Sequence, residues 1–268
     1  MASSTNQREV IPHMQHSPES IRDHSDSWPV HRAVCDVFVK IGGSILDHDS
    51  ATAALAPRIT GLCRQQRILI LTGGGQAAKR VKMNQIRVGG DFYRFWRATG
   101  LFPEVNAYLL ASYSTAFTVV SCAAEIAECL TAGNIPVFAP AGAILNSLYF
   151  LPDWLVTTDS MGLYFASLAG ARRYVIVSDV DGIYDRKPGE GTCGSPIPCL
   201  NIDDLERLSS SKLDQGFTHY FHRYPLPTVV VNGNHPDRVA AAICGAPTIG
   251  TEILVPRAAS AGKKQCVR

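Results

Sequence analysis

Apolar residues along the chain alternate between short runs typical of buried strands and longer segments with helical spacing. The run DVFVKIG, for example, alternates β-branched with other residues and ends on glycine, as does a strand that leads into a tight turn. Similar runs predict strands at residues 36–42, 67–73, 135–140, 154–158, 173–179, 228–233 and 251–255. Amphipathic spacing predicts helices at residues 51–66, 105–132, 159–170 and 236–244.

Strands that alternate with helices predict an α/β fold, in which helices cover both faces of a mostly parallel sheet. The first part of the chain is rich in Ser, His and Gln and has hardly any apolar periodicity. We therefore expect flexible tails at residues 1–32 and 256–268. The sequence pattern changes near residue 172, where RRYVIVSDVDGIYD begins. This change indicates two lobes, 33–171 and 172–255, that share one continuous sheet.

The composition of the chain argues against some classes of function. The chain has 268 residues, of which 46% are hydrophobic, so it can bury a large core. Its net charge is only +2, which argues against nucleic acid or a membrane surface as a partner. No apolar run reaches the roughly 18 residues of a membrane helix. The eight cysteines are scattered without a CxxC pair, so we expect thiols, no metal site and a cytoplasmic location.

Two glycine turns follow predicted strands. KIGGS (40–44) and TGGGQ (72–76) each place backbone N–H groups where a helix begins, and such groups bind phosphate. Either turn alone is as well explained by a tight strand-to-helix connection. The two together with Lys40, a cation at the end of a strand, favour phosphoryl transfer. The lysine precedes the glycines, so this is no Walker motif.

Two further strand ends carry carboxylates. SDVDGIYD (178–185) reads as a strand followed by an acidic turn, which suits either a nucleotide's sugar and base or an ordinary loop. Asp159, in TTDSMG, stands where a helix begins. It serves either as a plain helix cap or as the carboxylate that orients lysines at the centre of the site.

The segment from Lys79 to Arg97 is basic and aromatic, with Asp91 as its only acidic residue. Beside a phosphate-binding turn it favours a lid over an anionic acceptor, although a solvated helix face with buried aromatics has the same composition. We take Lys79, Arg87, Arg94 and Arg97 as candidate acceptor ligands.

The motifs VKIGGS, LILTGGG, TTDSMGLYFA, SDVDGIYD and VVVNGNHPDRV, in this order, resemble the amino acid kinase family. The resemblance covers about residues 36–254 and implies a three-layer αβα sandwich with ATP and Mg²⁺ as cofactors. It implies that the lobe at 33–171 binds the acceptor and the lobe at 172–255 the nucleotide. It also implies a homodimer or a higher homo-oligomer.

The resemblance assigns roles to individual residues. Lys40 is similar to the lysine that bridges donor and acceptor phosphates, and Asp159 to the organising carboxylate; Lys212 stands near the place of a second catalytic lysine. The acceptor turn is Gly73, Gly74 and Gly75. The nucleotide ligands implied are Gly42, Gly43, Ser44, Ser178, Asp179, Asp181, Gly182, Tyr184 and Lys187.

Within the family, the chain most resembles kinases of small phosphates and phosphonates, such as those of an aminomethylfuran phosphate and of fosfomycin. It departs from part of that group, because Gln76, Ala77, Ala78 and Lys79 stand where a histidine would follow the triple glycine. We therefore expect a small-molecule kinase whose acceptor is a phosphate monoester or a phosphonate. A nucleotide-dependent oxyanion storage or sensing protein, and a carboxylate or carbamate kinase, are the alternatives.

Overall fold

The computed structural model describes residues 34–147, 149–185, 194–208 and 212–256. The first predicted tail and all but Pro256 of the second lie outside these ranges. The strands are β1 (Val37–Ile41), β2 (Ile68–Thr72), β3 (Phe117–Val120), β4 (Ile135–Phe138), β5 (Arg173–Ser178), β6 (Cys199–Asn201), β7 (Thr228–Asn232) and β8 (Thr251–Leu254). The helices are α1 (Gly43–Leu46), α2 (Asp49–Thr60), α3 (Gly75–Val88), α4 (Phe92–Ala111), α5 (Ala123–Thr131), α6 (Ala141–Leu145), α7 (Thr158–Leu168), α8 (Ile202–Arg207), α9 (Phe217–Arg223) and α10 (Pro236–Cys244).

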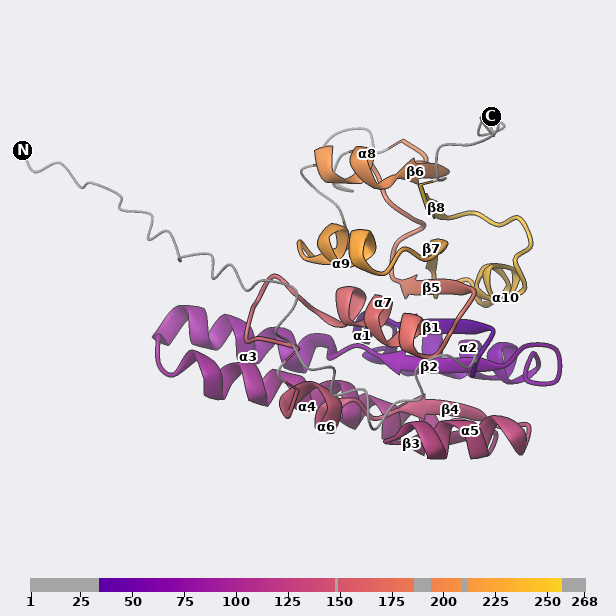
Figure 1. The fold of residues 1–268 in the computed structure, drawn as a ribbon, viewed down its shortest axis with the longest axis horizontal. Helices are drawn as coiled ribbons and strands as arrows, with labels where there is room; N and C mark the ends of the chain where they lie inside the picture. The colour runs from indigo at the N-terminus through magenta and orange to yellow at the C-terminus, as the bar shows by residue number, and fades with distance from the viewer. Residues whose placement is uncertain (1–33, 148, 186–193, 209–211, 257–268) are drawn as a thin grey trace, which may run out of the picture.

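The eight strands form one sheet in the order β3-β4-β2-β1-β5-β7-β8-β6. Every neighbouring pair is parallel except β7 and β8, which are antiparallel. The earlier part of the chain forms the lower half of the molecule in Figure 1, and the later part forms the upper half. The sheet therefore runs without a break through both predicted lobes.

Alternation along β1 explains how the sheet is covered. Val37, Val39 and Ile41 point to the face where α2, α4 and α10 pack. Phe38 points to the other face, which α5, α7 and α9 cover. Both faces of a parallel strand are thus buried, and the architecture is the expected three-layer αβα sandwich.

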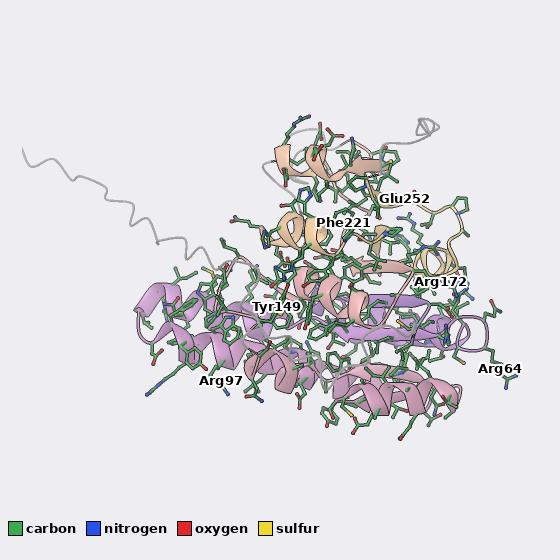
Figure 2. The ribbon with its side chains drawn as sticks, in the orientation of Figure 1. Arg64, Arg97, Tyr149, Arg172, Phe221 and Glu252 are labelled. Atoms are coloured by element: carbon green, nitrogen blue, oxygen red, sulfur yellow. The ribbon has the colours of Figure 1, made fainter. Side chains whose placement is uncertain are left out.

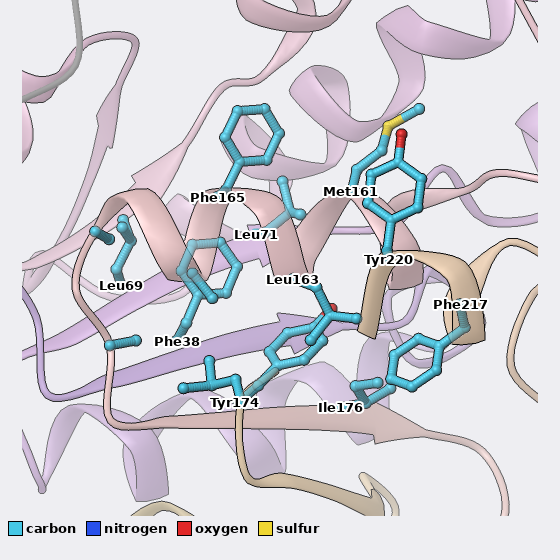
Figure 3. Packing of buried hydrophobic residues seen from close by; sticks show 14 of the residues in the cluster. Phe38, Leu69, Leu71, Met161, Leu163, Phe165, Tyr174, Ile176, Phe217 and Tyr220 are labelled. Carbon is cyan, nitrogen blue, oxygen red and sulfur yellow. The ribbon is translucent and has the colours of Figure 1, made fainter. Parts of the chain in front are cut away.

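The core under α7 is closely packed. Phe38 and Tyr174 meet edge to face with ring centroids 5.8 Å apart, and Leu163, Phe165 and Phe217 are buried beside them (Figure 3). A Cβ on Gly162 would lie 2.0 Å from the Tyr174 hydroxyl, so only glycine lets α7 come this close to β5. This close packing fixes α7 and the residues at its N-terminus.

Two predicted elements are wrong. Residues 154–158 form no strand; the Trp154 carbonyl accepts a hydrogen bond from Lys82 and the Leu155 carbonyl one from Gly216, so neither pairs with the sheet. The single helix predicted at 105–132 is broken by β3, whose Thr118, Val119 and Val120 suit a strand.

The basic segment at 79–97 is helical except at residues 89–91, which connect α3 to α4. It spans most of α3 and the start of α4, which lie side by side and extend beyond the sheet (Figure 1). No described residue of α3 is buried, so this helix stays at the surface. Among the described residues, no helix is long and apolar enough to cross a membrane.

Candidate active site

The carboxyl ends of four neighbouring strands meet at one edge of the sheet. The Gly73 N–H donates to the carbonyl of Ile41 at 2.8 Å, and the Gly42 N–H donates to that of Val177 at 2.8 Å. The Gly233 N–H donates to the carbonyl of Ser178, at 2.7 Å, in the same way. These bonds hold the chain just beyond β2, β1, β5 and β7 in one row, which is where open parallel sheets bind ligands.

The two glycine turns touch through their backbones. A Cβ on Gly43 would lie 2.0 Å from the Gly75 nitrogen, and one on Gly73 would lie 2.8 Å from the Gly43 nitrogen. Gly75 has a φ of +65°, a conformation that favours glycine. The structure therefore brings the predicted donor turn and the predicted acceptor turn together with no side chain between them.

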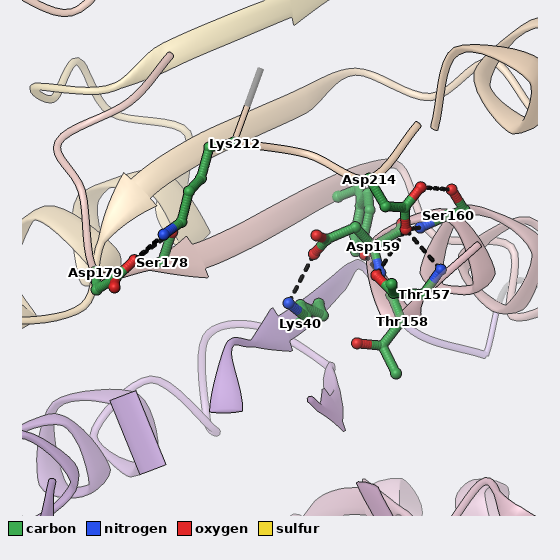
Figure 4. Close-up of polar contacts among 10 residues, drawn as sticks. Lys40, Thr157, Thr158, Asp159, Ser160, Ser178, Asp179, Lys212 and Asp214 are labelled. Carbon is green, nitrogen blue, oxygen red and sulfur yellow. Dashed lines mark hydrogen bonds and ion pairs between the residues drawn. The ribbon is translucent and has the colours of Figure 1, made fainter. Parts of the chain in front are cut away.

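Lys40 lies above this contact. Alternation in β1 turns its side chain to the α7 face, where its ammonium group is 2.7 Å from Asp159 Oδ1 (Figure 4). Both side chains are largely buried, at 10% and 14% exposure, so water screens the pair weakly. Apart from Lys40, Asp159 Oδ1 has no hydrogen-bond partner among the described residues.

Asp159 is not the cap of its helix. The N-cap of α7 is Thr157, whose hydroxyl accepts a bond from the Asp159 N–H at 3.4 Å. Of the two sequence-based interpretations of Asp159, the cation partner is therefore the one that the geometry matches. Its carboxylate is free to set the position of Lys40.

Asp214 is a component of the site that sequence reasoning missed. Its carboxylate accepts hydrogen bonds from the backbone N–H groups of Thr157 (2.8 Å) and Ser160 (3.1 Å) and from both hydroxyls. Burial, and after it the charge of Asp159, raises the pKa of Asp214 to about 6. In the sequence SSSKLDQGF, only the lysine was given a role in the site.

Lys212 forms the second ion pair of this edge. Its ammonium group is 2.7 Å from Asp179 Oδ1, just beyond the end of β5 (Figure 4). Burial pushes the pKa of Asp179 upward, but the hydrogen bond and charge of Lys212 outweigh burial, so the pKa is lowered. The predicted second lysine is thus held against the predicted nucleotide loop.

Asp181 is also held by cations and amides. It accepts hydrogen bonds from Asn232 at 2.9 Å and from Arg238 at 2.6 Å, and His235 lies 4.0 Å away. The hydrogen bond from Asn232 is the main reason that its pKa is lowered, and Arg238 adds to it.

The remaining nucleotide candidates take different places. Ser44 is in the first turn of α1, and Ser178 donates to Asp179 at 3.2 Å. Gly182 packs tightly, since a Cβ there would lie 2.6 Å from the Thr251 hydroxyl. Tyr184 follows on the same loop, and Lys187 lies outside the described residues.

A cavity of about 300 Å³ opens beside the second glycine turn. Lys40, Lys79 and Lys82 give it a basic side. Much of the remaining lining is apolar or aromatic: Trp96, Pro103, Ile144, Trp154, Val156 and Met161. Asp153 is the one carboxylate that lines this described cavity. The arrangement suits a ligand with an anionic end and a flat or apolar body.

Trp154 joins the cavity wall to the α3–α4 pair. Its indole N–H donates to Gln85 at 3.3 Å, its carbonyl accepts from Lys82 at 3.0 Å, and Phe92 packs edge to face on its ring. Lys82 also lies over the ring, 5.5 Å from its centroid. These contacts place Lys82 at the cavity. Lys82 was not among the acceptor ligands that we predicted from the sequence.

The three predicted arginine ligands do not line this cavity. Arg87 bonds to Asn84, and Arg94 pairs with Asp91 on the exposed start of α4. Arg97, at the lower edge of the molecule in Figure 2, donates to the carbonyl of Leu145. Their role as acceptor ligands stays a prediction, which the cavity does not support.

Comparison with known proteins matches the sequence to a family. The model of the amino acid kinase family matches residues 37–223 of the 268. A [5-(aminomethyl)furan-3-yl]methyl phosphate kinase of Methanocaldococcus jannaschii is 28% identical over 81% of this chain and 97% of its own. A uridylate kinase of Pyrobaculum calidifontis is 26% identical over 78% of this chain and 95% of its own.

The fold has solved counterparts too. A uridylate kinase of Archaeoglobus fulgidus superposes with a TM-score of 0.66 at 21% identity, over 82% of this chain and 100% of its own. A UMP kinase of Bacillus anthracis superposes with a TM-score of 0.66 at 20% identity, over 83% of this chain and 98% of its own. The sequence match over most of the chain is the stronger finding, and by it this protein belongs to the amino acid kinase family.

Proposed function

We propose that the protein is an ATP-dependent kinase that transfers the γ-phosphoryl group to an anionic acceptor, a phosphate monoester or a phosphonate. The contact between the two glycine turns beneath Lys40 is the observation that carries the proposal. Two rings of backbone N–H groups that touch can hold two phosphates close enough for direct transfer. Lys40 supplies the cation that follows the charge of the moving group.

The donor and the acceptor enter from different lobes. ATP lies on the lobe at 172–255, with its phosphates at the first glycine turn and Lys212. The acceptor lies on the lobe at 33–171, in the cavity beside Gly73, Gly74 and Gly75. No general base is needed, because a phosphate oxygen of the acceptor is already an anion at neutral pH.

Mg²⁺ fits the same edge of the sheet. Hard cations prefer oxygen ligands, and the carboxylates of Asp159 and Asp179 stand at the ends of α7 and β5. Asp159 Oδ1 is buried and has only Lys40 as a partner among the described residues. When bound with ATP, the ion supplies positive charge between the donor phosphates.

The cavity supports a small, flat acceptor. Its walls away from the lysines are mostly apolar, and Trp96 and Trp154 offer aromatic surfaces. Asp153 would attract an amino group on such a body. A ring that carries a phosphate, as in the name of the Methanocaldococcus jannaschii relative, has this chemistry.

A nucleoside monophosphate is the second candidate acceptor, because several relatives are uridylate kinases. Uracil and ribose need several hydrogen-bond partners. Apart from the three lysines, the polar side chains that line the described cavity are only those of Thr99, Asp153, Thr157 and Thr158. The oxyanion storage alternative has no support among the relatives described above, which are kinases. A carboxylate or carbamate kinase would need fewer than three lysines at the acceptor.

We also propose that the protein works in the cytoplasm as a homodimer or a higher homo-oligomer. The outer side of α4 exposes Leu101, Val105 and Tyr108, each at least half accessible. Their spacing places them on one helical stripe, which suits burial against a second copy.

The proposal is tested by incubating the protein with ATP, Mg²⁺ and one acceptor at a time, and by measuring ADP together with the phosphorylated product. The acceptors are small ring phosphates with and without an amino group, small phosphonates, UMP and acetate. We expect the ring phosphates to give the highest kcat/KM. A higher value for UMP would replace the first acceptor class by the second. Absence of transfer to every acceptor would refute the kinase proposal.

A further inference from the structure

Asp214 links two parts of the site that are far apart in sequence. Thr157 and Ser160, its partners on α7, precede it by 57 and 54 residues. The segment that follows Asp214 docks on the same region, because the Gly216 N–H donates to the carbonyl of Leu155 at 2.9 Å. A Cβ on Gly216 would lie 2.8 Å from Val156 Cγ2, so the contact is close.

On the α7 side, Asp214 binds the turn that carries Asp159. Thr157 and Ser160 flank Asp159, and four donors of these two residues converge on one carboxylate. An ionised carboxylate has about four acceptor positions, so Asp214 in this state can satisfy all of them. The Asp159 side chain has no comparable bonds of its own, and its position follows from this turn and from Lys40.

On the other side, Asp214 lies two residues beyond Lys212. Leu213 between them is 7% exposed and belongs to the core, whereas Lys212 is about half exposed. Leu213 and Asp214 therefore anchor this short segment to the rest of the protein. A movement of Asp214 would move Lys212 and Asp159 together.

We propose that Asp214 is a positioning residue. It holds Asp159, and through Asp159 also Lys40, at a fixed position relative to Lys212, so that the two lysines lie on either side of the path of the phosphoryl group. The proposal rests on the kinase function proposed above. Asp214 itself lines neither the cavity nor the glycine turns in the described part of the chain, although its partner Thr157 lines the cavity. Its effect on transfer is therefore indirect, through the two ion pairs that it keeps aligned.

Asp214→Asn is the first variant. Asparagine has the same shape and keeps one acceptor oxygen for the three donors that meet Oδ2, but it lacks the negative charge that strengthens these bonds. Its NH2 group also replaces the oxygen that accepts from the Ser160 hydroxyl. We expect kcat to fall at least ~10-fold, toward the ~100-fold that a 1 Å misplacement can cause. KM for ATP and for the acceptor should rise less than kcat falls, because the glycine turns and most of the cavity lining do not contact Asp214.

Asp204→Asn is the matched control. Asp204 is a carboxylate on α8 whose partners, Asn201 and Arg207, are exposed, and its replacement should leave kcat and KM unchanged. If Asp214→Asn does not fold, Ser160→Ala replaces it. That variant removes one donor from the buried Ser160, and kcat should fall about 3-fold or more.

The pH dependence separates positioning from a general loss of structure. The groups that face Asp214 are Asp159 on α7, the hydroxyl of Tyr174 on β5 and that of Tyr220 on α9. Protonated Asp214 resembles asparagine, so the ratio of wild-type to variant kcat should shrink as pH falls below about 6. Ionisation of the acceptor phosphate cancels in this ratio, because it affects both proteins.

Hydrogen exchange provides a readout that needs no acceptor. In Asp214→Asn, amide exchange at Thr157 and Ser160 should rise at least ~10-fold, while exchange in α8 stays constant. Unchanged exchange or an unchanged kcat would overturn the positioning role. If the wild-type protein phosphorylates no acceptor, the kinase proposal fails, and exchange alone decides whether Asp214 holds the turn.

Discussion

Gly43 and Gly75, separated by 31 residues in the chain, meet backbone to backbone at the edge of the sheet. A Cβ on Gly43 would lie 2.0 Å from the nitrogen and 2.2 Å from the Cα of Gly75. Neither atom belongs to a movable side chain, so an alanine at this position must push the two turns apart. The contact between the two turns therefore requires glycine at position 43, in addition to any requirement of the local turn.

Gly43→Ala should therefore reduce both activity and stability. We expect a loss of about 2 kcal/mol in the free energy of unfolding from overpacking. This corresponds to a Tm lower by roughly 4–8 °C. Transfer should fall by about 100-fold or more, because the two phosphates no longer sit at touching turns.

The control for this variant is Gly142→Ala in α6. A Cβ at Gly142 meets nothing within 4 Å, and alanine is the better helix former. Its Tm should stay equal or rise slightly, and its kcat should not change. Differential scanning calorimetry and steady-state kinetics on both variants check the prediction, and equal Tm values for the two would contradict it.

Lys40→Ala should abolish most of the transfer without loss of the fold. Removal of a single charge-stabilising group commonly costs about 10²–10³ in kcat. Because Asp159 then loses its cation, the double variant Lys40→Ala/Asp159→Asn should be more stable than Lys40→Ala alone. Circular dichroism, Tm and kcat measure these effects, and a near-normal rate in Lys40→Ala would contradict the role of Lys40.

The fold was largely predictable from the sequence because strands with two buried faces produce distinct apolar runs. Where the pattern misled, another local signal carried the information. The break between α4 and β3 lies in SYST (112–115). These polar residues favour a turn, but the segments on both sides have helical spacing, so the turn was not predicted. Residues 154–158 looked like a strand because Trp, Val and Thr are strand formers, but Trp154, Val156, Thr157 and Thr158 line a cavity instead.

The site was predictable only where the chain is contiguous. Glycine turns and strand-end carboxylates are local sequence patterns, so Lys40, Gly43 and Asp159 could be chosen as candidates, and the structure brings these three together. Asp214 acts on residues more than 50 positions away, and no local pattern encodes that contact. The arginines of α3 and α4 were chosen as acceptor ligands for a related reason. A basic composition does not tell which side of a helix faces the cavity.

Asp36 allows a prediction on stability and pH. Its carboxylate, at the start of β1, accepts bonds from Arg67 and Arg172, which precede β2 and β5 (Figure 2 labels Arg172). The hydrogen bond from the Arg67 side chain is the main reason that the pKa of Asp36 is lowered below its ordinary 3.8. The charged form therefore stabilises the fold above about pH 4, and this contribution is lost as pH falls through the lowered pKa.

Asp36→Asn should lower the Tm by a few degrees at pH 7, because hydrogen bonds to charged partners contribute about 1.5–3 kcal/mol. The difference from the wild-type protein should begin to shrink as pH falls below 3.8, where Asp36 becomes protonated in the unfolded state first. It should disappear once pH falls below the lowered pKa of the folded state. Thermal unfolding between pH 3 and 7 measures this trend. A difference that stays constant with pH would show that the charge of Asp36 is not the cause.

Lys79 and Arg94 lie on the two helices of the same hairpin, and only Lys79 lines the cavity. Lys79→Ala should raise KM for a phosphate acceptor about 10-fold, because one charge-assisted contact contributes 1.4 kcal/mol or more. KM for ATP should not change, since ATP is expected at the other lobe. Arg94→Ala removes the same charge from an exposed pair with Asp91 and should leave both constants unaltered. If Arg94→Ala instead raised KM for the acceptor and Lys79→Ala did not, the acceptor would bind at the start of α4, and the cavity between Lys79 and Trp154 would not be its site.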